Sequence, residues 1–380
     1  MTLTALSVLT IGTCAIWCMV GLYWFWIAGR IPALPRAGAP TDGVKVSVIV
    51  TACNEADTIG PALESLLALS YRPIELVIVN DRSTDDTGAI IDELIRDHDH
   101  ARVVHNEDRP EGWLGKVHAL HLGAKASTGD WLLFTDADVV YSEGVIADAM
   151  SYVESHGLDH FSLLPTMNTN TWLLDLTICA FTQFGFHKVF GLSPIPFGAG
   201  AFNMVRRQAL DHSPGLEWLK MEVADDAGLA LLIAESGGKS KMLTALDGLN
   251  LTWYPSLGAM FHGLEKNSAL VVSHGHLWRV FIFWVIGCFL VSMPFFGTLL
   301  SPNLWPALAV GMGSYILATW RARLRLSTRP WLALFAPVGF ILVGTCALWS
   351  MIQTLRRGGI DWRGTFYPWK DLVDGQRVKI

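Results

Sequence analysis

Charged side chains are scarce in this 380-residue sequence: they make up 16% of it, while 51% of the residues are hydrophobic. Soluble domains carry roughly 25% charged residues. This deficit and the mean hydropathy of +0.37 argue against a purely soluble protein. The same abundance of apolar and aromatic side chains excludes an intrinsically disordered chain. The length allows about two domains.

Cysteine and histidine give no sign of a disulfide framework or a metal site. None of the six cysteines has Cys-x-x-Cys spacing, so we interpret them as small buried side chains in a reducing compartment. The pairs His118/His121 and His274/His276 have ligand-like spacing, but neither has a convincing third ligand nearby. We expect structural or interfacial roles for both pairs.

The glycine-rich loops that usually bind phosphates are absent, since neither GxxxxGK[ST] nor GxGxxG occurs. Any nucleotide must therefore be held by carboxylates, a metal ion and a lysine. The net charge is −6, and residues 277–380 contain 11 of the 28 Lys and Arg residues but only 3 of the 34 Asp and Glu residues. The body before residue 277 is consequently acidic, which argues against nucleic acid as a partner.

The first long apolar run begins the chain, because no charged residue precedes Arg30. Residues 3–27 are long enough to span a hydrocarbon core. A cleaved signal peptide is disfavoured by the length of the run and by the lack of a basic start. Trp24 and Trp26 would form an aromatic belt, and Arg30 and Arg36 follow. The positive-inside rule then places the next domain in the cytoplasm, at a bacterial inner membrane.

A second uncharged stretch lies between Arg279 and Arg321. It predicts a helical hairpin, at about 279–300 and 304–320, with both ends in the cytoplasm. A third uncharged run covers 331–353 and leaves two alternatives open. If it crosses the membrane, the basic tail lies outside; if it is re-entrant, the tail stays inside. The sequence therefore predicts three or four spans.

These features divide the chain into five parts. We expect an N-terminal transmembrane helix, a catalytic domain, an interfacial segment, further transmembrane helices and an amphipathic tail, at 1–30, 44–255, 256–276, 277–355 and 356–380 respectively. The tail mixes aromatic and basic residues, which is typical of a membrane interface rather than of a globular fold.

Strands and helices are predicted to alternate in the middle of the chain. The predicted strands are 45–52, 74–79, 102–105 and 131–135, and the predicted helices are 54–69, 83–96 and 115–127. This alternation favours a parallel sheet with helices on both faces. Ligands bind such sheets beyond the carboxyl ends of the strands.

Polar clusters follow three of these strands. They are Cys53-Asn54-Glu55, Asn80-Asp81-Arg82 and Asp136-Ala137-Asp138. One such cluster would be a weak signal. Three of them, in order along one sheet, predict a binding site at that edge.

Five motifs occur in an order and spacing that resemble inverting family 2 glycosyltransferases with the GT-A fold. They are VSVIVTACNEA at 46–56, IVNDRSTDDT at 78–87, Gly115-Lys116, TDAD at 135–138 and ADD at 224–226. The resemblance covers about residues 44–262. It implies an α/β GT-A fold, a Rossmann-like mixed sheet, joined here to transmembrane helices. The membrane arrangement is similar to that of lipid-directed members, such as the hopanoid-associated and carotenoid-type enzymes and, more distantly, ceramide glucosyltransferases.

The resemblance implies how a nucleotide-diphosphate sugar would be bound. Asp138, supported by Asp136, would hold Mg2+ or Mn2+, a hard cation that prefers carboxylate oxygens. Lys116 would place a point charge on the phosphates. The base or ribose would be bound by Asp81, with two further polar residues nearby, Asn54 and Glu55.

The resemblance also implies the acid-base chemistry. Asp226 is the candidate general base that takes the proton from the acceptor hydroxyl, with Asp225 as the adjacent substitute. From the residues alone, two non-catalytic interpretations also stay open. The acid pair is also favourable at a helix N-terminus in any protein, and Lys116 is also compatible with a plain surface lysine.

Two departures from the family pattern matter. The family's Asp-Asp is Asn80-Asp81 here, which alters the nucleotide contacts, and no clear QxxRW motif occurs. The missing motif argues against processive polymer synthesis. Residues 172–192 read as an amphipathic helix at the membrane surface that lines an access path for the acceptor, or else as a buried core helix. The resemblance places Gly198 and Gly200 beside the acceptor.

The sequence thus predicts a metal-assisted membrane glycosyltransferase. It would move one sugar from a nucleotide-diphosphate sugar, with UDP the expected nucleotide, to a hopanoid, carotenoid, sphingolipid-like or polyprenyl lipid, with inversion. The rival hypotheses are an enzyme of the same fold acting on polyprenyl phosphate and a non-catalytic membrane subunit that binds sugar nucleotides.

Overall fold

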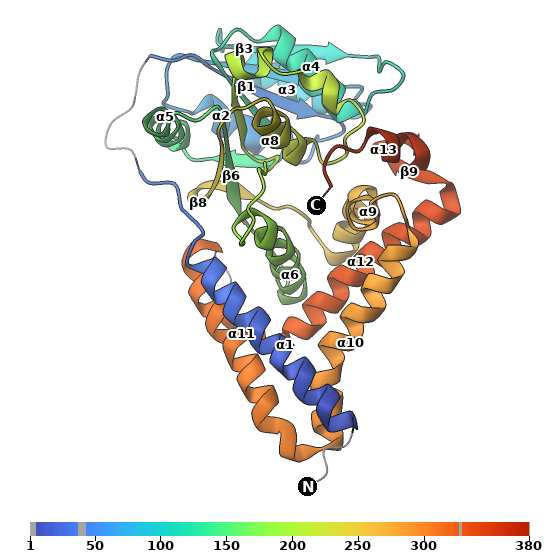
Figure 1. The fold of residues 1–380 in the computed structure, drawn as a ribbon. Coiled ribbons are helices and arrows are strands. Elements are labelled where there is room, and N and C mark those ends of the chain that lie inside the picture. Colours follow the sequence, from blue (N-terminus) through green and yellow to red (C-terminus); the bar gives the residue numbers. More distant parts are fainter. Residues whose placement is uncertain (1–4, 37–42, 327–328, 380) are drawn as a thin grey trace.

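The computed structural model describes residues 5–36, 43–326 and 329–379. An α/β domain forms one end of the molecule, and helices converge to a narrow point at the other end (Figure 1). The N-terminal end of α1 lies at this narrow point. Of the segments predicted above, residues 1–4 of the first, residues 327–328 of the fourth and residue 380 of the tail lie outside the described part.

A mixed sheet of eight strands forms the centre of the domain, in the order β3-β2-β1-β4-β7-β6-β8-β5. The strands in chain order are β1 (Val46–Ala52), β2 (Ile74–Asp81), β3 (Ala101–Asn106), β4 (Trp131–Asp136), β5 (Val139–Tyr141), β6 (His160–Met167), β7 (Asn203–Arg206) and β8 (Ser240–Leu251). The first four are parallel, as predicted, and β7 runs antiparallel to both β4 and β6. The four predicted strands agree with the structure within two residues.

Helices cover both faces of this sheet. Its inner strands are buried on both sides, so that Val48 and Val50 face one apolar cluster while Ile49 faces another. The first cluster packs under α2 (Ile59–Leu67), α3 (Thr87–Ile95) and α5 (Val145–His156); the second packs under α4 (Gly115–Ala126), the short turn η1 (Leu216–Leu219) and α8 (Asp225–Glu235). A short helix, α7 (Arg207–Asp211), follows β7.

Two predicted helices start later than the sequence pattern suggested. The segment after β1 turns first, with Asn54 in the left-handed region at φ 55°, and α2 begins only at Ile59. Before α3, a carboxylate oxygen of Asp85 accepts a hydrogen bond from the backbone N–H of Thr87. Such local bonds from Asp and Asn side chains compete with helix formation and favour turns.

Three segments among the described residues are long and apolar enough to span a membrane: α1 (Ala5–Ala28), α10 (Trp278–Leu300) and the stretch Pro330–Arg357. The last consists of η3 (Pro330–Phe335) and α12 (Ala336–Arg357). The predicted hairpin is present as α10 and α11 (Trp305–Leu326), joined by η2 (Pro302–Leu304). Arginines in the last turn reduce the hydropathy of α11, which nevertheless runs alongside α1 (Figure 1).

The contact between α1 and α11 depends on small residues. A Cβ atom added at Gly21 would lie 2.2 Å from the Ser314 hydroxyl oxygen, so the glycine permits this close approach. Trp24 was expected in an aromatic belt, but it is buried and stacks on Phe186. That expectation was wrong because α6 (Trp172–Val189) occupies the position that lipid would otherwise take.

Helices α6 and α9 connect the domain to the bundle. Leu174 and Ile178 of α6 are buried against Met260 and Leu264 of α9 (Leu257–Ser273) and against Cys346 of α12. Most of α6 is therefore covered by other helices, and exposed aromatic side chains remain at Trp172 and Phe184.

The structure of the C-terminal tail differs from the prediction. The strands β9 (Gly359–Trp362) and β10 (Thr365–Pro368) pair antiparallel, and α13 (Trp369–Gly375) follows. Ile360, Tyr367 and Leu372 are buried in the apolar cluster beneath α4 and α8. The tail is therefore folded onto the α/β domain rather than spread over a membrane interface. It lies on the same side as this domain, as the re-entrant alternative requires.

Candidate active site

The three polar clusters meet at one edge of the sheet. The register pairs Ala52 with Asn80 across β1 and β2, and Thr51 with Asp136 across β1 and β4. All three strands therefore end at the same level. The residues that follow them, from Cys53, Asp81 and Asp136 onward, line the edge where parallel sheets bind ligands.

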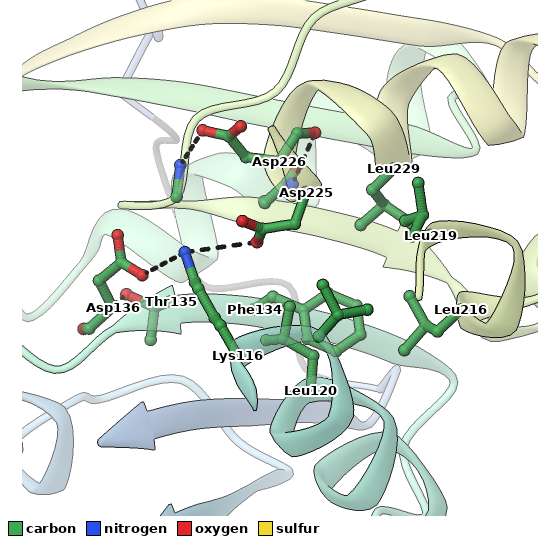
Figure 2. Close-up of a pocket in the computed structure, with 13 residues that line it drawn as sticks. Lys116, Leu120, Phe134, Thr135, Asp136, Leu216, Leu219, Asp225, Asp226 and Leu229 are labelled. Carbon is green, nitrogen blue, oxygen red and sulfur yellow. Dashed lines mark hydrogen bonds and ion pairs between the residues drawn. The ribbon is translucent and has the colours of Figure 1, made fainter. Parts of the chain in front are cut away.

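Lys116 joins two of the predicted acids. It lies in the first turn of α4, and its Nζ is 2.9 Å from Asp136 Oδ1 and 3.3 Å from Asp225 Oδ2 (Figure 2). Burial alone would lower the pKa of Lys116, but the surrounding carboxylates, Asp136 first, raise it above its ordinary value. Lys116 is thus a permanently charged group inside the site and not a plain surface lysine.

Asp226 presents its carboxylate to the same pocket from the first turn of α8. Its Oδ2 accepts a hydrogen bond from the backbone N–H of Gly200 at 3.1 Å, and its Oδ1 accepts one from Ala227 at 2.8 Å. Burial and then the neighbouring Asp225 raise the pKa of Asp226 to about 6. A carboxylate with a pKa near 6 is well suited to accept a proton at neutral pH.

The loop between α6 and β7 approaches these acids closely. A Cβ at Gly200 would lie 2.5 Å from Asp136 Oδ2, and a Cβ at Gly198 would lie 2.2 Å from the backbone oxygen of Asp226. Both positions therefore need glycine for steric reasons. The apolar floor of the pocket is formed by Leu120, Phe134, Leu216, Leu219 and Leu229 (Figure 2).

A buried network of hydrogen bonds, which the sequence did not predict, holds α8 in place. Asn203 donates from Nδ2 to the backbone oxygen of Asp226 at 3.1 Å, and its Oδ1 lies 2.7 Å from His160 Nε2. Burial lowers the pKa of His160 to about 4, so its ring is neutral. Nε2–H therefore donates to Asn203, and Nδ1 accepts from Ser240 Oγ at 2.8 Å. Isolated polar residues in strands carry no motif that would reveal this arrangement.

Asp138 is the residue best suited to bind a cation. Its Oδ1 is buried and has no hydrogen-bond partner among the described residues. Burial, then Asp136 and Glu55, raise the pKa of Asp138 to about 7. A divalent cation would neutralise these adjacent carboxylates, and oxygen ligands suit Mg2+ or Mn2+. The residues present therefore fit the predicted metal.

The protein supplies only part of a complete coordination shell. Within the described ranges, no group of three or more His, Cys, Asp or Glu residues is arranged to hold a metal. Mg2+ usually takes its remaining ligands from water and substrate phosphates. The two carboxylates at 136 and 138 are consistent with such a substrate-completed site.

Asp81 is placed at the predicted edge, but its carboxylate is already used. Arg82 donates to it from Nε at 3.1 Å and from Nη2 at 2.8 Å, and Asn106 Nδ2 donates at 2.7 Å. The predicted contact of Asp81 with a base or ribose stays a prediction. The structure shows that Arg82 also lies at this edge of the sheet, where it forms an ion pair with Asp81.

Asn54 and Glu55 also have partners within the protein. Asn54 Oδ1 accepts from the backbone N–H of Thr84 at 2.8 Å, which joins the loops after β1 and β2. Glu55 pairs with Arg363 of the tail and accepts from Thr58 Oγ1 at 2.8 Å. Asn54 therefore orders the loop, while Glu55 faces the tail.

The folded tail reaches this edge of the sheet, and the sequence did not predict this contact. Gly115 at the start of α4 donates its backbone N–H to the Tyr367 hydroxyl at 3.1 Å. Arg363 Nη1 donates to the Cys53 backbone oxygen at 2.8 Å. The repeated aromatic residues of the tail were the available signal, but the same residues also suit a membrane interface.

The remaining candidates include the pair His118/His121 and the cysteines. His118 and His121 both contact the ring of Trp113, at centroid distances of 5.6 and 5.0 Å, and no third ligand joins them in the described structure. All six cysteines are free.

Residues 47–213 match the family model described as "Glycosyl transferase family 2". This part of the chain is similar to the family 2 glycosyltransferases. Lys116, Asp136 and Asp138 lie inside the matched region, whereas Asp225 and Asp226 follow it. This match supports the predicted class of enzyme.

Curated relatives match only part of this chain. The poly-beta-1,6-N-acetyl-D-glucosamine synthase of Staphylococcus epidermidis is 30% identical over 131 residues, which is 33% of this chain and 30% of that protein. Glycosyltransferase GlyG of Streptococcus pneumoniae is 27% identical over 114 residues, 30% of this chain and 36% of that protein. The matches thus span about a third of these relatives.

The fold is shared with a solved enzyme over nearly the whole chain. The mannosyltransferase PcManGT from Pyrobaculum calidifontis, solved with GDP-Man and Mn2+, superposes with a TM-score of 0.55 at 22% identity. The match covers 92% of this chain and 99% of that one. The predicted α/β GT-A fold is confirmed, and three described segments are long and apolar enough to span a membrane.

Proposed function

We propose that this protein transfers a single sugar from a nucleotide-diphosphate sugar to a lipid at a membrane surface, with inversion. The observation that carries the proposal is Asp226. Its carboxylate faces the pocket that contains Lys116 and Asp136, and its pKa is raised to about 6. A base in this place can accept the proton of an attacking hydroxyl.

The chain's own residues supply most of the chemistry. Lys116 keeps a positive charge beside the acids, and the backbone N–H groups of Gly200 and Ala227 orient the Asp226 carboxylate. Mg2+ or Mn2+, held by Asp138 and Asp136, would supply charge neutralisation for the departing diphosphate. UDP is our expected nucleotide, and the bacterial inner membrane with a cytoplasmic domain is our expected location.

The lipid acceptor is supported by the way the domain joins the helices. Buried contacts of α6 with α9 and α12 connect the domain to the helix bundle, which contains the three apolar segments. A donor from water and an acceptor from a bilayer would meet at this junction. The missing QxxRW motif argues against a growing polymer as the acceptor.

A polyprenyl phosphate is the second candidate acceptor. Two cations near the acids, Lys266 and Arg363, favour it, because both lower the pKa of Asp136 and would attract an anionic acceptor. A phosphate oxygen needs no strong base, so the two acceptor classes differ in their dependence on Asp226.

The test uses full-length protein purified in detergent, Mn2+, radiolabelled UDP-sugars and bacterial lipid extract. We expect label to enter the organic phase with wild type and to be lost with Asp138→Asn. If Asp226→Asn keeps most of the transfer, the acceptor is a phosphate. If wild type binds a UDP-sugar but transfers it to no lipid, the non-catalytic hypothesis replaces this proposal.

A further inference from the structure

Two cations from the C-terminal part of the chain lie on separate elements near the acid cluster, by which we mean Asp136, Asp225 and Asp226. Lys266 lies on α9, and Arg363 lies in the turn of the β9–β10 hairpin; α9, β9 and α13 lie close together beside the domain (Figure 1). Both residues follow the region matched by the family model. Lys266 lies against Trp362, the neighbour of Arg363 in the chain, and Arg363 donates to the backbone at Cys53 beyond β1, so both cations lie at the edge of the sheet where the acids lie.

Lys266 is half-buried and lacks an anionic partner in the described part of the chain. Its Nζ lies 3.9 Å from the centroid of the Trp362 ring, a cation–π contact. The adjacent Glu265 pairs instead with Arg357 at 2.7 Å. Burial and the charge of Lys116 lower the pKa of Lys266 to about 8. A cation in this situation is stabilised when an anion binds beside it.

The hairpin turn directs Arg363 toward the carboxyl end of β1. Its backbone is in the left-handed region, with φ 51°, and Gly364 follows at φ 74°. Two-residue hairpin turns of this kind need positive φ at both positions. The guanidinium donates to the Cys53 backbone oxygen at 2.8 Å and pairs with Glu55. A guanidinium has five N–H donors, so further donors remain for a ligand.

The known lysine of the site is less available. Lys116 forms ion pairs with both Asp136 and Asp225, at 2.9 and 3.3 Å, so its charge already serves these carboxylates. The acids therefore need additional cations before a diphosphate can approach them. Lys266 and Arg363 are the groups that the C-terminal part of the chain provides.

We propose that Lys266 and Arg363 form a phosphate-binding subsite above the acid cluster, with Trp362 positioning the lysine and Glu55 positioning the arginine. This proposal rests on the proposed function, because the diphosphate of the donor is the first ligand expected there. A phosphate on the acceptor presents the same chemistry. The test below separates these two sources.

The test measures binding without turnover, by titration calorimetry of the full-length protein in detergent with Mg2+. The probes are inorganic pyrophosphate for the donor and citronellyl phosphate for the acceptor. A charge-assisted hydrogen bond contributes about 1.5–3 kcal/mol, which corresponds to a loss of roughly 10- to 100-fold in affinity for each variant, Lys266→Gln or Arg363→Gln. Weaker pyrophosphate binding assigns the subsite to the donor, and weaker citronellyl phosphate binding alone assigns it to the acceptor.

Matched controls use exposed residues of the same type, Lys241→Gln and Arg356→Gln, which should bind both probes as wild type does. Lys266→Arg should retain affinity because it retains the charge, and if Lys266→Gln does not fold, Arg363→Gln tests the subsite on its own. Unchanged affinity of the Gln variants for both probes overturns the subsite, as does a wild type that binds neither. A protein that binds pyrophosphate through Lys266 but transfers no sugar refutes only the proposed function.

Discussion

At the scale of single residues, the site contains carboxylates that differ in their surroundings. Asp136 is held ionised by Lys116, with its pKa lowered, whereas burial raises the pKa values of Asp138 and Asp226 to about 7 and about 6. Groups with pKa values moved apart in this way commonly divide the chemical roles of a site between them. We assign cation binding to Asp138 together with Asp136, and proton transfer to Asp226.

The first prediction concerns Asp226. The Asp226→Asn variant should lose roughly 10²–10⁴-fold in kcat for a hydroxyl acceptor, the usual contribution of general base catalysis. The wild-type rate should rise with pH through about 6, because only the ionised carboxylate accepts a proton. Initial rates between pH 5 and 8.5 check both points. The exposed Asp211→Asn is the control and should keep the wild-type profile.

The second prediction concerns Asp138. Its folded-state pKa is raised, so ionisation costs stability as pH increases from the unfolded value through about 7. At pH 8 without metal, Asp138→Asn should therefore melt at least about 2 °C above wild type. Added Mn2+ should raise the Tm of wild type and leave that of the variant unchanged. A metal-dependent shift of equal size in both proteins would contradict this assignment.

At the scale of elements, the loop before β7 sets the distance between the acids. Gly200→Ala should reduce transfer at least about tenfold, because the added Cβ would lie 2.5 Å from Asp136 Oδ2 and displace it. Gly60→Ala in α2 is the matched control, since nothing lies within 4 Å of its Cβ position. Alanine should stabilise that helix by about 1 kcal/mol. Equal activity of both variants would show that the loop does not position Asp136.

The parallel half of the sheet was predictable and the tail was not, for physical reasons. Strands such as Val46–Ala52 are continuous apolar runs because both faces are buried, and polar residues mark their ends. The strands β5 and β7 have only three and four residues, too few for a clear period. Tyr367 and Trp362 act through contacts with residues far away in the chain, Gly115 and Lys266, which composition does not reveal.

Likewise, the sequence predicted those residues of the candidate site that belong to short motifs. Asp136, Asp138 and Lys116 come from short motifs, and the structure brings Lys116 to Asp136. The bond between Asn203 and the backbone of Asp226 joins residues that are 23 positions apart and carry no shared pattern. The contact of Arg363 with Glu55 was missed because arginine among aromatic residues also suits a lipid surface.

At the scale of the whole molecule, the tail and the α/β domain lie at the same end of the helix bundle (Figure 1). The tail backbone donates from Arg377 and Val378 to Glu222, which also accepts from Ala224 next to the acid pair. The far end of the bundle contains the start of α1 and the turn between α10 and α11 (Figure 1). The helix bundle therefore has one end that carries the α/β domain and the tail, and an opposite end that carries the turn between α10 and α11.

The fourth prediction follows from this arrangement. In bacterial cells, green fluorescent protein fused to the C-terminus should fluoresce, and alkaline phosphatase fused there should be inactive. Alkaline phosphatase inserted after Ser301, between α10 and α11, should be active, because this turn lies on the opposite side. An active phosphatase at the C-terminus would mean that the tail has left the domain.

The central claim is transfer of a single sugar to a lipid with Asp226 as the base. Mass spectrometry of lipid extracts from cells that express wild type or Asp226→Asn tests it most directly. We predict that one lipid class gains the mass of one sugar residue with wild type and that this product is absent with the variant. Equal lipid profiles in the two strains, or a polymer as the only new product of wild type, would contradict the account.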